Sequence, residues 1–202
     1  HDALPISSTM ACIAEALGMT VPGGASPPAV TADRMRVAER TGAQAVAMAK
    51  QRLGIDQILT AKAFENAMRV LLAIGGSTNG IVHLTAIAGR LGFEVDLEAL
   101  DRMGRETPVL VDLKPSGQHY MEHFHAAGGM ATLLRELKPL LHLDALTVTE
   151  TDDVFARFLQ SEIEAWSPNP KWLPVETEEQ PLLDLLELGL LLLQLQVVEP
   201  RP

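Results

Sequence analysis

Apolar residues recur every three or four positions along most of the first 149 residues, which is the spacing of one buried face of a helix. The first such pattern predicts a helix that Ser8 or Thr9 caps and that ends near Gly18. Thr31, Thr60 and Asp96 precede later patterns and are expected to cap those helices. The further helices are expected at 31–53, from 60 to the glycine-rich break at 75, and at 79–91, 96–105, 119–127 and 131–137.

One short segment has the pattern of a strand instead. Residues 109–113 are apolar at every position except Asp112, and the turn at 114–117 closes them. The helix at 31–53 has only small apolar residues on its inner face, so we expect it to pack closely against backbone or another helix. Residues 1–149 therefore predict a helix-rich α/β fold with a small sheet.

Composition divides the chain near residue 150. Residues 1–149 carry 15 acidic and 13 basic residues, whereas residues 150–202 carry 11 acidic and 3 basic residues. The second part also holds a possible helix at 152–166 and a leucine-rich stretch at 181–193 that is too short to span a bilayer. We expect this tail to be helical or disordered. The net charge of −10 argues against nucleic acid as a partner.

Further features of the composition narrow the class of protein. A single cysteine, Cys12, excludes an internal disulfide framework and indicates a small buried side chain. There is no signal peptide and no apolar run of membrane-spanning length, so the expected location is the cytoplasm without membrane attachment. A lone histidine on a helix, His83, is expected to be a hydrogen-bonded core residue.

A glycine-rich loop at 75–80 opens directly into a predicted helix. Glycines let backbone approach a ligand, and the free N–H groups of a helix N-terminus attract carboxylate or phosphate. Ser77, Thr78 and Asn79 add hydroxyl and amide groups, which makes them candidate substrate-lining residues. The alternative is a helix–helix turn in which the same three side chains act as caps.

A second pattern, His119-x-x-Glu122-His123, matches the inverted zinc-peptidase motif. On one helix the two histidines would lie four residues apart on the same face, as zinc chelation requires, and Glu122 would polarise a bound water. The match is short and lacks a convincing downstream glutamate. A zinc metallopeptidase therefore stands as a remote alternative.

Three stretches together resemble one family. They are residues 8–19, residues 63–84 with Gly-Gly-Ser-Thr-Asn at 75–79, and residues 108–129 with Val-Asp-Leu-Lys-Pro-Ser-Gly at 111–117. This combination resembles the dihydroxy-acid and phosphogluconate dehydratases over about residues 7–149. The Pro-Gly at 22–23 and the Tyr-Met-Glu-His-Phe-His run are more similar to the sugar-acid, arabinonate-type members than to the branched-chain biosynthetic enzyme.

The resemblance implies a hydro-lyase that dehydrates a 2,3-dihydroxy acid or sugar acid to a 2-keto acid. The family uses an iron–sulfur cluster, a magnesium ion and a serine base, and a homo-oligomer is expected for the parent enzyme. In this chain Ser8 and Thr9 would lie near the cluster. The dihydroxy-acid dehydratase of branched-chain amino-acid synthesis is the alternative within the family. A non-catalytic helical interaction module, with the leucine-rich tail as its partner surface, is the alternative from another class.

The sequence also departs from the family. His1 stands where the family has a cluster cysteine, and the other cysteines, the magnesium ligands and the catalytic serine have no counterpart in the matching region. Residues 1–6 equal the translation of a common sequencing-adapter end, so we expect a non-native leader. The tail at 150–202 has no match to the family. These departures lead us to expect an inactive fragment of the N-terminal domain that binds neither cofactor stably.

Overall fold

The computed structural model describes residues 4–114 and 116–149. The described helices are α1 (Leu4–Ala16), α2 (Ala32–Gln51), α3 (Ile55–Ile58), α4 (Ala61–Ala73), α5 (Asn79–Arg90), α6 (Leu97–Glu106), α7 (Met121–Ala126), α8 (Gly129–Leu137) and the 3₁₀ turn η1 (Lys138–Leu140). The predictions for His1 and for the tail at 150–202 lie outside the described residues, as do the first three residues of the predicted leader at 1–6.

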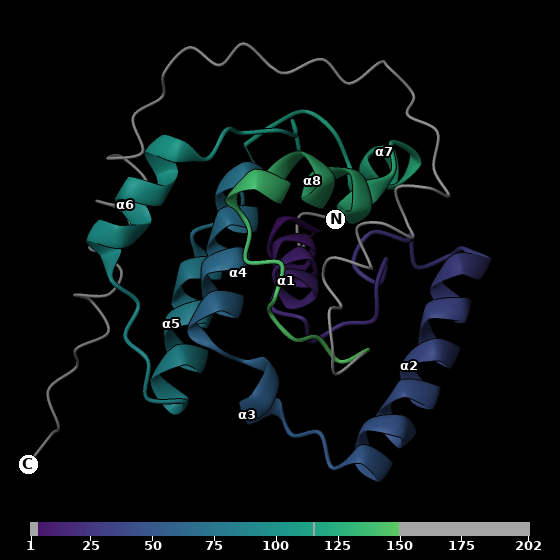
Figure 1. Cartoon of the computed structure of the whole chain (residues 1–202). Coiled ribbons are helices and arrows are strands. Elements are labelled where there is room, and N and C mark those ends of the chain that lie inside the picture. The colour runs from purple at the N-terminus through teal and green to yellow at the C-terminus, as the bar shows by residue number, and fades with distance from the viewer. Residues whose placement is uncertain (1–3, 115, 150–202) are drawn as a thin grey trace, which may run out of the picture.

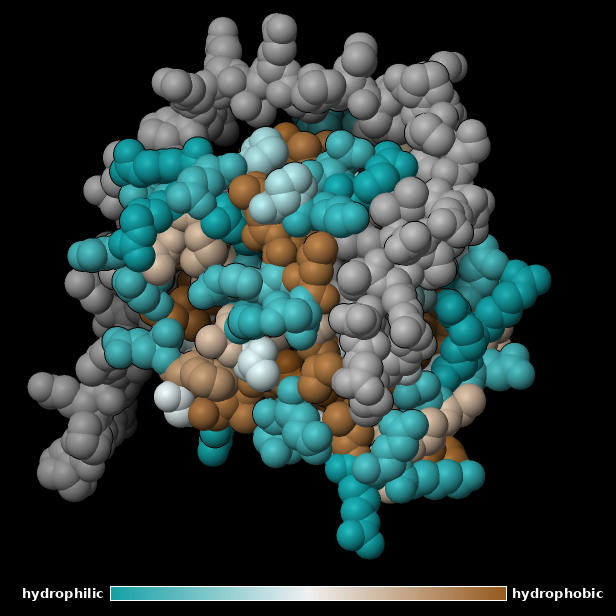
Figure 2. All heavy atoms as spheres, in the orientation of Figure 1, coloured by the Kyte–Doolittle hydropathy of each residue, from teal (hydrophilic) through white to brown (hydrophobic). Residues whose placement is uncertain are grey.

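Helix α4 lies at the centre of the fold. It contacts α1, α5, α6 and α8, and α1 lies directly beside it in Figure 1. Eight of its thirteen residues are buried, including the fully enclosed Val70. Apolar residues form a band across the middle of the visible face in Figure 2, bordered by hydrophilic residues. The core is therefore a cluster of helices around α4, because each neighbour buries one apolar stripe against it.

Local cap chemistry explains where several of these helices begin. The Thr60 hydroxyl accepts a hydrogen bond from Ala63 N, and the Asp96 carboxylate accepts one from Glu98 N. These two predicted caps are confirmed. Thr31 stands at the N-cap of α2 as predicted, but its hydroxyl donates to the carbonyl of Pro28 and caps nothing.

Helix α1 begins earlier than the sequence indicated. It starts at Leu4, so Ser8 and Thr9 lie inside the helix and do not cap it. Pro5 occupies the first turn, where a missing N–H costs no helical hydrogen bond. The Thr9 side chain is consequently free of a capping role and accepts a hydrogen bond from Ser77 N.

The small sheet is not confirmed. In the described part of the chain, residues 109–113 form no strand, and the only β pairing is an isolated bridge between Leu113 and His119. Leu110 N donates instead to the carbonyl of Ala73 at the end of α4, 2.8 Å away. Residues 109–113 therefore lie in an extended conformation against the end of α4, because the described residues provide no second strand beside them.

Helix α2 does not pack as predicted. Val37 is its only buried residue, whereas Met35 and Val46 are exposed. In Figure 1 α2 stands at the edge of the molecule, apart from the other helices. Small side chains permit close packing, but the described residues provide no helix against this face.

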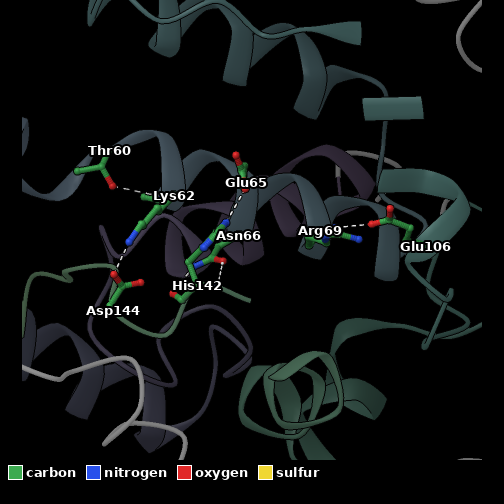
Figure 3. A network of polar contacts seen from close by, with 9 residues as sticks. Thr60, Lys62, Glu65, Asn66, Arg69, Glu106, His142 and Asp144 are labelled. Atoms are coloured by element: carbon green, nitrogen blue, oxygen red, sulfur yellow. Dashed lines mark hydrogen bonds and ion pairs between the residues drawn. The ribbon is translucent and has the colours of Figure 1, made fainter. Parts of the chain in front are cut away.

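A polar network fastens the end of the described chain to α4 (Figure 3). Asn66 is completely buried, and its amide donates to the carbonyl of His142 at 2.9 Å and accepts from His142 N at 2.8 Å. Lys62 pairs with Asp144, and Glu65 pairs with the His142 ring. The segment after η1 is thereby held along α4 by side chains from one helix.

Candidate functional site

The three resemblance stretches meet beside the N-terminal half of α1. A small pocket there is lined by Ser8, Leu113, Lys114, His119, Tyr120 and Met121. A second pocket shares four of these residues and adds Thr9, Cys12, Ile74 and Gly76. We call the two together the Ser8–Lys114 pocket. Residues more than a hundred positions apart therefore form one continuous site.

Glycine 76 makes the close approach of α1 and the glycine-rich loop possible. A Cβ atom at this position would lie 2.6 Å from Leu71 Cδ1 and 3.0 Å from Thr9 Cγ2. Real Cβ atoms essentially never show the first distance, and the second is tighter than most Cβ contacts. Gly75 adopts a left-handed φ of 55°, which also favours glycine. The loop thus brings its backbone against α1, and Ser77 N donates to the Thr9 hydroxyl at 3.2 Å.

The candidate lining residues Ser77, Thr78 and Asn79 lie beside the pocket and are not among its lining residues. The Ser77 hydroxyl accepts hydrogen bonds from Asn79 N at 3.3 Å and from Asn79 Nδ2 at 3.0 Å. Ser77, one residue before the N-cap Thr78, thus makes a local turn at the start of α5, and the Thr78 side chain makes no cap hydrogen bond. Ser77 and Thr78 are half-buried and Asn79 is exposed, and their role as substrate-lining residues stays a prediction.

The segment at 112–120 forms the opposite wall. His119 N donates to the carbonyl of Asp112 at 2.9 Å, and Lys114 N donates to the carbonyl of His119 at 3.0 Å. The Ser116 hydroxyl donates to the carbonyl of Gly75 at 2.9 Å, which joins this wall to the glycine-rich loop. Backbone and hydroxyl contacts therefore fix the pocket from both sides.

Lysine 114 provides the positive charge at the pocket. Its Nζ lies 2.8 Å from the Tyr120 hydroxyl and 4.2 Å from the centroid of the Tyr120 ring. An ammonium group over an aromatic face is held by the ring quadrupole, which limits its motion. The sequence reasoning missed Lys114 and Tyr120, although the polar residues that follow the 109–113 segment were a signal for them.

The zinc-peptidase interpretation is wrong in its geometry. Helix α7 begins at Met121, so His119 precedes the helix and does not share a helical face with His123. The two rings meet edge to face, with centroids 5.5 Å apart. Within residues 4–114 and 116–149, no group of three or more His, Cys, Asp or Glu side chains could hold a metal ion.

The described residues do not fit an iron–sulfur cluster. Cys12 is completely buried in α1, as the sequence predicted, and burial raises the pKa of its thiol far above the usual range, with a further increase from nearby Glu15. Cluster ligation requires thiolates. The Cys12 side chain therefore serves as a packing residue.

Two further positions complete the survey of candidate residues. His83 is exposed on α5, so the prediction of a core histidine is wrong, because its side of the helix has no packing partner among the described residues. Ser8 is half-buried at the pocket and Thr9 is buried behind it. No helix in the described residues is both long and apolar enough to cross a bilayer.

Comparison with known proteins identifies the class to which this helical domain belongs. The family of the dihydroxy-acid/6-phosphogluconate dehydratase N-terminal domain matches residues 6–153. The chain therefore belongs to the dihydroxy-acid/6-phosphogluconate dehydratase family, as the resemblance indicated.

Individual relatives fall into two groups. The chain is 51% identical over 141 residues to the L-arabonate dehydratase of Azospirillum brasilense, and 50% identical over 138 residues to the L-arabinonate dehydratase of Rhizobium leguminosarum. It is 46% identical over 142 residues to the dihydroxy-acid dehydratase of Methanosarcina barkeri. These matches cover 68%, 67% and 70% of the chain. The chain spans about a quarter of the length of these relatives, at 24%, 24% and 26%.

Proposed function

We propose that residues 7–149 form one wall of the active site of a hydro-lyase that dehydrates a sugar acid to a 2-keto acid. The convergence of the three resemblance stretches on the Ser8–Lys114 pocket carries this proposal. The higher identity to the two arabinonate-type enzymes supports a sugar acid over the branched-chain dihydroxy acid. Relatives of this class also support a small-molecule substrate.

The chain's own residues suit an anionic, hydroxylated substrate. The Lys114 ammonium group attracts a carboxylate, and the hydroxyls of Ser8 and Tyr120 can exchange hydrogen bonds with substrate hydroxyls. Since the described residues do not fit a cluster, they supply binding and orientation of the substrate and not the metal chemistry of the family. We propose that the 202 residues alone turn over no substrate.

A segment exchange tests the substrate class. The matching segment of this chain replaces its counterpart in the A. brasilense L-arabonate dehydratase, and formation of 2-keto acid from L-arabonate is measured. The exchanged enzyme is expected to retain turnover, and Lys114→Met in it is expected to raise KM about tenfold with little change in kcat. Lys138→Met, an exposed lysine at η1, is the matched control.

The M. barkeri segment in the same host shows whether any foreign segment is tolerated. If that enzyme works on L-arabonate and the one with this chain's segment does not, the sugar-acid proposal fails. Separately, the 202-residue chain is treated with iron and sulfide and assayed with aldonates. Formation of 2-keto acid there would refute the proposed inactivity.

A further inference from the structure

A histidine of helix α7 joins three separate segments of the chain. Nδ1 of His125 lies 3.3 Å from the hydroxyl of Ser26, which belongs to the loop between α1 and α2, and the two side chains are hydrogen-bonded. Nε2 of the same ring lies 3.8 Å from the carboxylate of Asp33 in the first turn of α2. Ser26 is only 5% exposed, and His125 is half-buried. The His125 ring therefore connects α7 with the loop and with α2.

The loop that carries Ser26 is fixed to α1 by a buried carboxylate. Glu15 is 4% exposed, and its two carboxylate oxygens accept hydrogen bonds from Gly23 N and Ala25 N, each at 2.8 Å. Hydrogen bonds to an ionised group are among the strong ones in proteins. The backbone directly before Ser26 is consequently held in place by α1.

The same loop is also fixed to α2 and to the start of α8. The Arg34 guanidinium donates to the carbonyl of Gly24 at 2.8 Å and to that of Pro27 at 2.6 Å. A Cβ atom at Gly129, the first residue of α8, would lie 2.4 Å from Ser26 Oγ. Ser26 therefore presents its hydroxyl from a fixed position beside the junction of α7 and α8.

Helix α7 needs such an attachment because it is short. It has six residues, of which Phe124 alone is buried, and it packs beside α8 in Figure 1. A single apolar contact leaves a helix of this length able to rotate about its own axis. The next residue, His125, projects about 100° further around that axis. Two neighbouring attachments in different directions therefore fix the rotation of α7.

The rotation of α7 determines one wall of the Ser8–Lys114 pocket. Tyr120 directly precedes the helix and Met121 is its first residue, and both line the pocket. The Tyr120 hydroxyl is the group that meets Lys114 Nζ at 2.8 Å. A rotation of α7 would move the Tyr120 ring and change this contact.

We propose that His125 is a positioning residue of the Ser8–Lys114 pocket. Through its hydrogen bond to Ser26 it fixes α7, and it thereby holds Tyr120 beside Lys114 in the arrangement that binds a hydroxylated carboxylate. His125 does not line the pocket itself, so it acts through Tyr120. Binding groups need such support, because a small displacement weakens the contacts they make. The role in substrate binding rests on the function proposed above, whereas the positioning of Tyr120 does not.

NMR of the full 202-residue chain tests the positioning without any substrate. Tyr120 is the only tyrosine of the sequence, so ring-labelled tyrosine gives one set of signals. His125→Phe and Ser26→Ala each remove the hydrogen bond and are expected to shift or broaden these signals. His125→Asn keeps an amide nitrogen near the position of Nδ1 and should retain the wild-type signals. His83→Phe, at an exposed position of α5, is the matched control. Circular dichroism verifies that each variant is folded.

Kinetics in the exchanged L-arabonate dehydratase test the effect on the substrate. His125→Phe and Ser26→Ala are expected to raise KM about fivefold with little change in kcat, since they weaken binding of substrate and transition state alike. His125→Asn should restore most of the affinity. Unchanged Tyr120 signals in both His125→Phe and Ser26→Ala overturn the positioning role. Altered signals with an unchanged KM leave the positioning intact and contradict the proposed function of the pocket.

Discussion

Asparagine 66 is expected to contribute more to stability than any other single polar side chain in the network of Figure 3. Its amide makes two hydrogen bonds to the backbone of His142 from a completely buried position. Asn66→Ala removes both bonds and leaves an N–H and a carbonyl of a half-buried segment without a partner. Each lost bond costs about 0.5–1.5 kcal/mol, and an unsatisfied buried group costs about 1–3 kcal/mol. The expected loss of unfolding free energy is therefore about 2–3 kcal/mol.

Urea unfolding followed by the helical circular dichroism signal measures this loss. At about 2–4 °C per kcal/mol for a chain of this size, the thermal midpoint should fall by about 4–12 °C. Asn79→Ala is the matched control, because Asn79 is exposed and its side chain bonds only locally to Ser77. It should change stability by less than about 0.5 kcal/mol. Equal effects of the two substitutions would refute the idea that Asn66 fastens the terminal segment.

Three further predictions concern single positions. Gly80→Ala should destabilise the chain by about 1–3 kcal/mol in urea unfolding, because a Cβ there would lie 2.8 Å from Leu71 Cδ1 and 2.9 Å from Ile13 Cδ1. Gly89→Ala is the control on the same helix. A Cβ there meets nothing within 4 Å, so this substitution should stabilise the chain by up to about 1 kcal/mol. Cys12 should resist a thiol reagent in the native chain and react in urea, since burial raises its pKa; rapid native labelling would contradict this. Lys62 lowers the pKa of the Asp144 carboxyl below its ordinary 3.8, so the stabilisation is complete above that pH and is lost as the pH falls through the lowered value. An NMR titration should find that Lys62→Met returns the Asp144 pKa to its ordinary range.

The parts of the fold that follow from local chemistry could be read from the sequence. Helices α4, α5 and α6 are amphipathic, and Thr60 and Asp96 cap two of them within three residues of the backbone they bind. Amphipathic spacing and N-cap residues can be recognised within one short segment, without knowing which other segments pack against it. The predicted start of α1 at Ser8 or Thr9 was wrong: the helix begins at Leu4, because a proline such as Pro5 is tolerated in the first turn of a helix.

Features that depend on distant partners could not be read in this way. The 109–113 segment is apolar enough for a strand, but a strand needs a neighbour, and the segment finds the end of α4 instead. The short helix α7 excludes His119 because the His119 backbone bonds to Asp112 and Lys114. A pattern of five residues does not contain this information. Likewise, the small residues of α2 indicated close packing without indicating whether a partner lies in the same chain.

The glycine-rich loop shows why the site was only partly predictable. Two interpretations were open for it, a ligand-binding loop and a helix–helix turn; the structure shows the hydrogen bonds of a turn, and the ligand-binding interpretation stays a prediction. Ser77 binds Asn79 at the start of α5, while Gly76 lines the pocket and Gly75 accepts a bond from Ser116. The backbone of the loop therefore approaches the pocket while its polar side chains stabilise the turn.

This division of roles has a physical cause. The loop can reach α1 only where no side chain intervenes, and Gly76 is the position at which Thr9 lies closest. When a residue lines the pocket only through its backbone, the sequence shows nothing of this role except that the residue is small. Under the proposed function, the polar groups that bind the substrate are therefore those of the opposite wall, where Lys114 and Tyr120 lie. The loss of substrate affinity expected for Lys114→Met follows from this arrangement, and substitutions of Ser77 should act first on the stability of α5.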